Sequence, residues 1–415
     1  MALRLMSGAF PTTPFSALNK LTNMPSIIIY LRGEAAKGAA RLQGYGDWTV
    51  ETAPVGKGVI KAHSTISNDF LADLDLPGNK FRDLVKPILV LDKNYSITYP
   101  DSDTMDEYRH SLLERVGTQC VNSILCYTDG SSTEEGVGGG YLTTTKNNES
   151  DIITECSFKL PDHCSVFQAE VMAIKEGATS MLELRNKTIT FWSDSLSALK
   201  ALSNKLIKSS TVISCHDALT KLATYNNVSL SWIAAHSDFW GNERADVLAK
   251  SGTTCDNTLY CNMPQTYIKT LINDKVDKLA EAEWNSLPHW HTNFVLGTKQ
   301  KSTIDTINKD LINNRLHYRT AIHLITGHTG LNKHLHKMNI VDSSSCPNCG
   351  CDEETVAHFL GQCPFHAQLR GDHFATYYVS INDIFDHHPI SRIIGFANKS
   401  KRFQFPGSSD DTGVT

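Results

Sequence analysis

Between residues 121 and 254 this 415-residue chain alternates β-branched runs with amphipathic segments, which restricts its possible folds more than any other feature. Runs rich in β-branched and aromatic residues predict five strands: 121–128, the Gly-rich stretch after Gly130, 152–160, 187–194 and 228–235. Amphipathic spacing predicts four helices: 167–184, the segment from Ser195, 211–225 and 243–252. The order β-β-β-α-β-α-α-β-α predicts an α/β fold, a mixed five-stranded sheet with flanking helices.

Four acidic residues lie at the ends of these expected elements. Asp129 follows the first strand and Asp194 ends the fourth. Glu170 opens the first helix, and Asp246 lies near the start of the last. If the first and fourth strands are neighbours, both aspartates leave the sheet at the same edge, where the two helix acids can join them.

Four carboxylates at one edge would repel each other, and a cation makes such an arrangement tolerable. Hard oxygen ligands suit Mg²⁺, for which Mn²⁺ is expected to substitute. Two such ions about 4 Å apart can activate a water and stabilise the leaving oxygen of a phosphodiester. His236, in the loop before the last helix, has the right side chain to move a proton during product release.

Each acid also has an ordinary structural explanation. Asp129 could belong to an Asp-Gly turn, and Asp194 could cap the following helix. Glu170 could be a solvated helix residue, and Asp246 a favourable charge near a helix N-terminus. Their order and positions together favour the shared site over four separate explanations.

The motifs YTDGS, FQAE, WSDS and AAHSDFWGNERADVLAK resemble the type 1 ribonuclease H domain in sequence, spacing and predicted topology. The resemblance implies that Asp129, Glu170, Asp194 and Asp246 bind metal, and that His236 is the family's mobile histidine. It also implies cleavage of the RNA strand of an RNA–DNA hybrid.

Some positions depart from the family pattern. Ala235 and Asp238 stand where glycines commonly flank the histidine, and Val166 and Phe167 replace the polar pair with which cellular enzymes read RNA 2′-hydroxyls. The segment SVFQAE resembles the retroelement branch of the family instead. The GVGGG segment is not a phosphate loop, because it lacks the Lys-Ser/Thr ending and precedes a strand; we expect a hairpin.

A second cluster of potential ligands lies near the C-terminus. Four residues have metal-ligand spacing: Cys346, Cys349, His358 and Cys363. Three thiolates and one imidazole can close a tetrahedral Zn²⁺ site with no open position, which predicts a structural role. Cys351 and His366 are spare candidates. The alternative is a set of reduced, buried cysteines with incidental histidines.

The remaining chain is expected to form a helical segment at 1–42, a partly disordered connection at 43–118 and the ribonuclease H domain at 119–254. The next segment is expected to be a helical linker region at 255–340, with helices around 266–287 and 303–326. After it we expect a zinc-binding helical module at 341–370 and a C-terminal tail at 371–415.

The flanks carry a further resemblance. Residues 6–42 are similar to the segment after the reverse transcriptase of jockey-like non-LTR retrotransposon polyproteins, and LITGHTGLNKHLHKMNI with the Cys/His cluster is similar to their C-terminal end. No Tyr-x-Asp-Asp polymerase motif occurs, so we expect no DNA synthesis. The chain is expected to be a fragment of such a polyprotein or a gene derived from one.

Composition excludes several classes. The longest apolar run, 27–31, is far shorter than the ~20 residues of a membrane span, and no signal-peptide core precedes it. Eleven scattered cysteines fit an intracellular, reducing compartment, without deciding between nucleus and cytoplasm. A net charge of −5 argues against a strongly basic nucleic-acid coat.

Three functions stay open at this stage. An RNA–DNA hybrid is the expected partner of an active enzyme, and single-stranded or structured RNA is the second candidate. The first alternative is a catalytically weak or inactive element remnant that binds nucleic acid or protein. The second makes the zinc module the working part, with an unidentified protein as its partner.

Overall fold

The computed structural model describes residues 2–45, 67, 69–74, 76, 82–100, 108, 123–145, 149–235, 239–286, 309, 314–350 and 352–403. The chain divides into two compact units, Arg32–Asp274 and Met1–Leu31 with Lys275–Thr415. Two long helices, α3 (Ile27–Gly44) and α10 (Gln265–Asn285), each contain residues of both units. Among the described residues, no helix has the length and apolar character to cross a membrane.

The five predicted strands all form, and the sheet around them has six strands rather than five. The predicted strands are β4 (Ser123–Thr133), β5 (Gly136–Thr144), β6 (Ile152–Leu160), β7 (Thr188–Ser193) and β9 (Asn227–Trp232). The order is β3-β9-β7-β4-β5-β6; β5 is antiparallel to both neighbours, and the other pairs are parallel. The sixth strand, β3 (Ser96–Thr98), was missed because three residues are too few to show a period.

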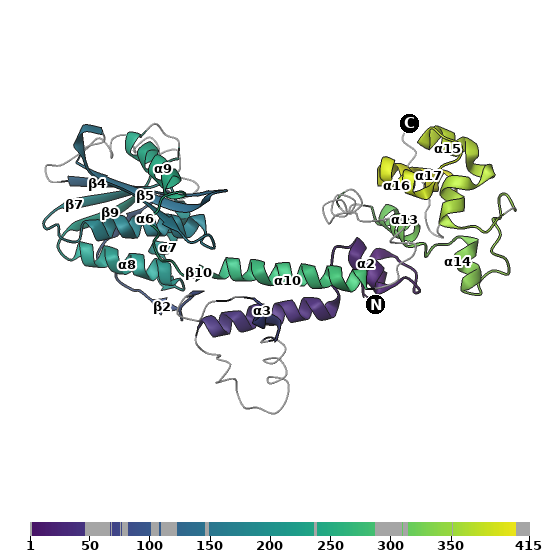
Figure 1. Cartoon of the computed structure of the whole chain (residues 1–415), viewed down its shortest axis with the longest axis horizontal. Helices are drawn as coiled ribbons and strands as arrows, with labels where there is room; N and C mark the ends of the chain where they lie inside the picture. The colour runs from purple at the N-terminus through teal and green to yellow at the C-terminus, as the bar shows by residue number, and fades with distance from the viewer. Residues whose placement is uncertain are drawn as a thin grey trace, which may run out of the picture. The chain divides into compact units, whose positions relative to one another are not determined.

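Helices cover both faces of this sheet (Figure 1). One face carries α9 (Trp240–Gly252), and the other carries α6 (Val166–Ser180), α7 (Leu196–Ser203) and α8 (Ser210–Ala223). The GVGGG segment is β5 of a hairpin, as predicted, and its glycines let α9 approach closely. A Cβ at Gly138 would lie 2.4 Å from the carbonyl carbon of Gly252. The core between the layers is apolar and includes Tyr127, Ile174, Phe191 and Leu199.

Part of the predicted connection at 43–118 is ordered structure. Besides β3, it supplies β1 (Arg82–Asp83), which pairs with β10 (Met263–Pro264), and β2 (Ile88–Leu89), which pairs with β8 (Leu206–Ile207). These short strands form by pairing with segments far away in the sequence, so no local sequence pattern predicts them. Most other residues of the predicted connection lie outside the described ones.

The other unit is helical and combines both ends of the chain. Its helices are α1 (Ala2–Ser7), α2 (Phe15–Leu21), α13 (Arg315–Thr326), α14 (Asn332–Lys337), α15 (Ala367–Phe374), α16 (Ile381–His387) and α17 (Ile390–Lys399). A π turn (His358–Gln362) and a 3₁₀ turn (Pro364–His366) lie between α14 and α15. Leu18 of α2 and Ile325 of α13 belong to one core. His323 Nε2 donates a 3.1 Å hydrogen bond to the Gly8 carbonyl.

The stretch predicted as a C-terminal tail is folded through Phe403. Ile384 of α16 and Ile393 of α17 have no exposed surface, and Ile390, Ile394 and Ala397 continue the buried stripe of α17. This helical spacing of apolar residues drives the segment into the core. Residues 404–415, the end of the predicted tail, lie outside the described residues.

Candidate active site and metal centre

Two neighbouring parallel strands place Asp129 and Asp194 at one sheet edge. Thr128 of β4 is paired with Ser193 of β7, so the aspartates that follow them leave the ladder side by side. The expectation that the first and fourth strands are neighbours is confirmed. Trp232 at the end of β9 donates its indole N–H to the Asp194 carbonyl at 3.0 Å, which ties a third strand to this edge.

The third acid reaches the edge from the N-terminal end of α6. Ser165 caps this helix, because its hydroxyl accepts from the Gln168 N–H and the Gln168 side chain accepts from the Ser165 N–H. Gly130 makes room for the helix, since a Cβ there would lie 2.5 Å from the Glu170 nitrogen. One carboxylate oxygen from each of Asp129, Glu170 and Asp194 lies within 4.8 Å of the others.

Burial makes this group of three acids electrostatically costly. Glu170 is 7% exposed and Asp129 is 8% exposed. Burial, and then the neighbouring Asp129 and Asp194, raise the pKa of Glu170 well above its ordinary value. Burial and then Asp194 raise the pKa of Asp129 to about 7.

The donor set fits a hard divalent cation. Among the described residues, the buried Glu170 Oε2 has no hydrogen-bond partner, although such an atom normally has one. The Gly130 N–H holds Asp129 Oδ1 at 2.8 Å, so this carboxylate is oriented in advance. A cation bound by the three acids would satisfy the orphaned oxygen and remove the repulsion.

Asp246 lies beside this group but is not part of it. Its carboxylate pairs with Lys250 of α9 at 2.6 Å, while its charge still acts on Asp129. Asn242, also on α9 and 3% exposed, has its side-chain N–H 3.5 Å from Asp194 Oδ2. Sequence reasoning missed Asn242 and Lys250; only their place in GNERADVLAK, at helical spacing around Asp246, could have suggested them.

The ordinary explanations for the acids do not match their surroundings. Asp129 lies within β4 rather than in a turn, and Ser195, not Asp194, caps α7. Glu170 is buried rather than solvated. The first-turn acid of α9 is Glu243, and Asp246 lies further along the helix. His236 lies outside the described residues.

The RNase H family model matches residues 121–254, the region that carries this sheet and all four acids. Residues 121–254 form an RNase H domain. No curated protein matches the sequence.

Solved RNase H structures resemble this part of the chain. RNase H1 from the archaeon Halobacterium salinarum NRC-1 is 20% identical, with 31% of this chain and 96% of that chain covered and a TM-score of 0.26. The N-terminal RNase H domain of Rv2228c from Mycobacterium tuberculosis, fused to maltose-binding protein, is 18% identical, with 32% and 94% covered and a TM-score of 0.28.

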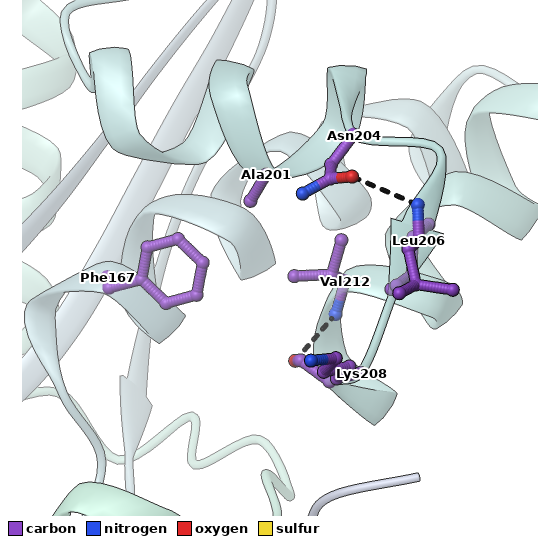
Figure 2. A pocket seen from close by; sticks show the side chains of 8 residues that line it. Phe167, Ala201, Asn204, Leu206, Lys208 and Val212 are labelled. Atoms are coloured by element: carbon purple, nitrogen blue, oxygen red, sulfur yellow. Dashed lines mark hydrogen bonds between the residues drawn. The ribbon is translucent and has the colours of Figure 1, made fainter. Parts of the chain in front are cut away.

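An open pocket of about 410 Å³ lies in the RNase H domain, next to the first turn of α6 (Figure 2). The ring of Phe167 forms one wall, one helical turn before Glu170, and Val212 of α8 lies across from it. Asn204 and Lys208, from the segment between α7 and α8, supply polar groups. Among the described residues none that lines the pocket is acidic, so its chemistry suits an anionic ligand with flat, apolar parts.

Outside the RNase H domain, the predicted Cys/His ligands converge. The ligand atoms of Cys346, Cys349, His358 and Cys363 all lie within 4.8 Å of one another. Cys346 Sγ is 3.8 Å from Cys363 Sγ, and Cys349 Sγ is 3.3 Å from His358 Nε2. Zn–S bonds of about 2.3 Å in a tetrahedron put two sulfurs about 3.8 Å apart, so the donor set fits Zn²⁺.

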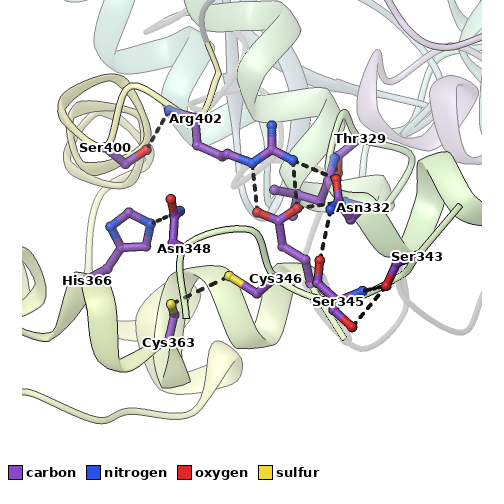
Figure 3. Close-up of polar contacts among 12 residues, drawn as sticks. Thr329, Asn332, Ser343, Ser345, Cys346, Asn348, Cys363, His366, Ser400 and Arg402 are labelled. Carbon is purple, nitrogen blue, oxygen red and sulfur yellow. Dashed lines mark hydrogen bonds and ion pairs between the residues drawn. The ribbon is translucent and has the colours of Figure 1, made fainter. Parts of the chain in front are cut away.

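The surrounding fold supports these positions. The Cys346 carbonyl accepts from the Gly350 N–H at 2.8 Å, and Gly350 has a φ of +69°, so the cysteines share a tight turn. Arg402 donates to both oxygens of the fully buried Glu354 at 2.7 Å and to Asn332 at 3.1 Å (Figure 3).

The spare candidates have different outcomes. His366 Nε2 lies 3.2 Å from the Asn348 amide (Figure 3). Its ring packs edge-on against Phe359, and His366 is not part of the four-ligand group. Cys351 lies outside the described residues.

Proposed function

We propose that the RNase H domain is an endoribonuclease that hydrolyses the RNA strand of RNA–DNA hybrids with two Mg²⁺ ions, for which Mn²⁺ can substitute. One observation carries the proposal: the convergence of Asp129, Glu170 and Asp194 at one sheet edge, with a buried oxygen of Glu170 left without a hydrogen bond. A stable apolar core gains nothing from three repelling acids, whereas a cation site needs them.

In this mechanism Asp129, Glu170, Asp194 and Asp246 would hold the cations. When bound, the ions supply an acidified water and stabilise negative charge on the phosphate. Gly130 and Asn242 orient the carboxylates of Asp129 and Asp194. Lys250 balances the charge of Asp246 until a cation does so.

His236 would take up or deliver the proton during departure of the product. Its ordinary pKa makes an imidazole suited to exchange a proton near neutral pH. Asp238, two positions after His236 in the sequence, is an acid where the family commonly has glycine.

The pocket beside α6 is proposed to bind a part of the substrate next to the phosphate that is cut. Phe167 offers a flat apolar surface to a base or sugar, and the exposed Lys208 offers a positive charge to a backbone phosphate. Both contacts would help an otherwise acidic domain to hold a polyanion.

The C-terminal cluster is proposed to hold one structural Zn²⁺ through Cys346, Cys349, His358 and Cys363. The four donors are already close together, three of them are buried, and no fifth His, Cys, Asp or Glu belongs to the group among the described residues. The flanking resemblance supports an origin in a jockey-like non-LTR retrotransposon polyprotein.

The test is cleavage of an end-labelled RNA–DNA hybrid by the full chain in Mg²⁺ or Mn²⁺, with Asp194→Asn beside it. The RNA strand should be cut by the parent protein only, and EDTA should stop the reaction. Asp162→Asn, which changes an exposed acid before α6, is the matched control and should cut normally. If the folded parent protein binds the hybrid without cutting it, the proposal of an enzyme fails and a nucleic-acid-binding remnant becomes the better interpretation.

A further inference from the structure

A buried carboxylate lies upstream of the region that the family model matches. Asp83 ends β1 and is 8% exposed. The strand is anchored on both sides of this residue: Arg82 donates to the Ala40 carbonyl at 2.8 Å, and Asp83 itself pairs with Pro264 of β10. A charged group in such a position has to be compensated by donors.

The first set of donors comes from the start of α8. The Ser209 hydroxyl lies 2.8 and 2.9 Å from the two oxygens of Asp83, and the Ser210 hydroxyl and the Thr211 N–H donate to Oδ1 at 2.9 Å. A carboxylate is favoured at a helix N-terminus because the backbone N–H groups there lack partners. An asparagine of the same shape would offer one accepting oxygen instead of two, so one of these donors would face an NH₂ group.

The remaining donor comes from the helix that carries Glu170. Gln168 Nε2 lies 3.2 Å from Asp83 Oδ2, and it also donates to the Asn262 carbonyl at 2.9 Å. The orientation of the amide is determined, since Gln168 Oε1 accepts from the Ser165 N–H. Gln168 is 1% exposed, so its amide depends on these protein partners rather than on water for its hydrogen bonds.

The first turn of α6 is therefore held from two directions. On one side the backbone of β4 at Gly130 leaves no space for a Cβ next to the Glu170 nitrogen. On the other side Gln168 is tied to Asp83. Glu170, two residues after Gln168, faces two carboxylates that repel it, and repulsion would displace a helix turn that was not anchored.

We propose that Asp83 is a positioning residue for the active site: it holds Gln168, and through the first turn of α6 it keeps Glu170 within reach of Asp129 and Asp194. The inference rests on the proposed function. It also means that the catalytic geometry depends on a residue outside the RNase H domain as the family model delimits it.

The test measures hybrid cleavage by the full chain carrying Asp83→Asn, beside Asp92→Asn, which changes an exposed acid of the same upstream segment. Asp83→Asn should lower kcat by roughly tenfold or more and raise the Mg²⁺ concentration for half-maximal activity, with KM for the hybrid unchanged. Asp92→Asn should leave all three values unchanged. Thermal unfolding of each protein is recorded in parallel.

A charge exchange separates positioning from a general loss of stability. Gln168→Glu places two carboxylates against each other and should lower kcat further than Asp83→Asn. In the double variant Asp83→Asn/Gln168→Glu the asparagine can donate to the glutamate, and most of the Gln168→Glu loss should be recovered. If Asp83→Asn does not fold, Gln168→Ala, which leaves Asp83 with its donors on α8, takes its place.

Three results would overturn the inference: a kcat and Mg²⁺ midpoint of Asp83→Asn equal to those of the parent protein, equal values for Gln168→Ala where it is used, or a double variant no better than Gln168→Glu. If the parent protein does not cut hybrid, the proposed function fails, and Mn²⁺ titration calorimetry then tests Asp83 separately. Weaker Mn²⁺ binding by Asp83→Asn than by Asp92→Asn supports the inference, and equal binding refutes it.

Discussion

The acidic group and the Cys/His group both gather metal-ligand side chains, but they differ in how they tolerate the absence of a metal. The acids are anions by default, and burying them together raises the pKa of Glu170 and Asp129. Cysteine thiols are ordinarily neutral at pH 7. Burial raises the pKa of the Cys363 thiol to about 12, so this thiol stays protonated until a metal displaces its proton. Without its ion, a catalytic site of this kind keeps its fold but holds carboxylates that repel each other, whereas a structural site loses the bonds that hold its fold together.

The largest difference should appear on metal removal. Zinc chelation at neutral pH is expected to unfold the C-terminal unit, because structural Zn²⁺ contributes on the order of 10 kcal/mol in small domains. Mg²⁺ removal should leave the RNase H domain folded. Hydrogen exchange followed by mass spectrometry distinguishes the two units, and zinc content should be one ion per chain. Unchanged protection of α13 and α17 after complete zinc removal would contradict this.

Neutralising one acid should separate activity from stability. Glu170→Gln is expected to lower cleavage roughly a thousandfold, about 4 kcal/mol, because it removes a charged ligand. The same change should raise the unfolding temperature in EDTA, since it relieves repulsion among the acids. Glu183→Gln, at an exposed position after α6, is the control and should alter neither property. A lower unfolding temperature for Glu170→Gln would mean that the acids are not strained.

Acid should affect the two units with opposite signs. Burial lowers the pKa of His323 to about 4, below its unfolded value of 6.5, so the unfolded chain binds the extra proton and stability falls as pH drops from about 6.5 to 4. For a fully buried group this is about 3 kcal/mol. The pKa of Asp129 is raised to about 7 from 3.8, so without metal its contribution is favourable at low pH and is lost as pH rises towards 7.

Urea unfolding between pH 4 and 7, without added Mg²⁺ or Mn²⁺ and without a chelator that would remove zinc, measures both slopes when hydrogen exchange is followed in each unit. His323→Gln should flatten the slope of the helical unit and leave that of the RNase H domain unchanged. Parallel slopes in the two units of the parent protein would refute the contrast.

The smallest expected effects come from one substitution made at both metal clusters. Gly130→Ala should cost about 1–3 kcal/mol, because the new Cβ would lie 2.5 Å from the Glu170 nitrogen. Gly350→Ala meets no atom within 4 Å, but its φ of +69° should cost about 1 kcal/mol. Denaturant titration gives both values, and cleavage should fall for Gly130→Ala only. If Gly350→Ala lowers the free energy of unfolding more than Gly130→Ala does, the close contact described at Gly130 is contradicted.

The sequence predicted those features that depend on regular elements. The proximity of Asp129 and Asp194 could be predicted because they follow strands that were expected to be neighbours. The proximity of Cys346 and Cys349 could be predicted because their short spacing limits their separation. The distance between Asp246 and the other acids could not be predicted, since it depends on how α9 lies across the sheet and on the pairing with Lys250.

Other features had no local signal. Asp83 meets donors that lie 85 to 128 positions away in the chain, and nothing around it in the sequence distinguishes it from a surface acid. The helices at 381–399 are a different case, because Ile390, Ile393 and Ile394 do have a helical apolar period. The sequence prediction gave more weight to the polar end of the chain that follows them.

The helical unit is assembled from the first and last parts of the chain, with Leu18 in the same core as Ile394. During synthesis, residues 1–31 leave the ribosome long before their partners exist, while the RNase H domain can complete its sheet once β9 has emerged. The helices within residues 2–31 therefore keep apolar faces exposed until residues near 400 have been translated. A chain cut short between residues 275 and 380 would have a complete RNase H domain but would lack partners for residues 1–31, which would then be a target for chaperones and proteases.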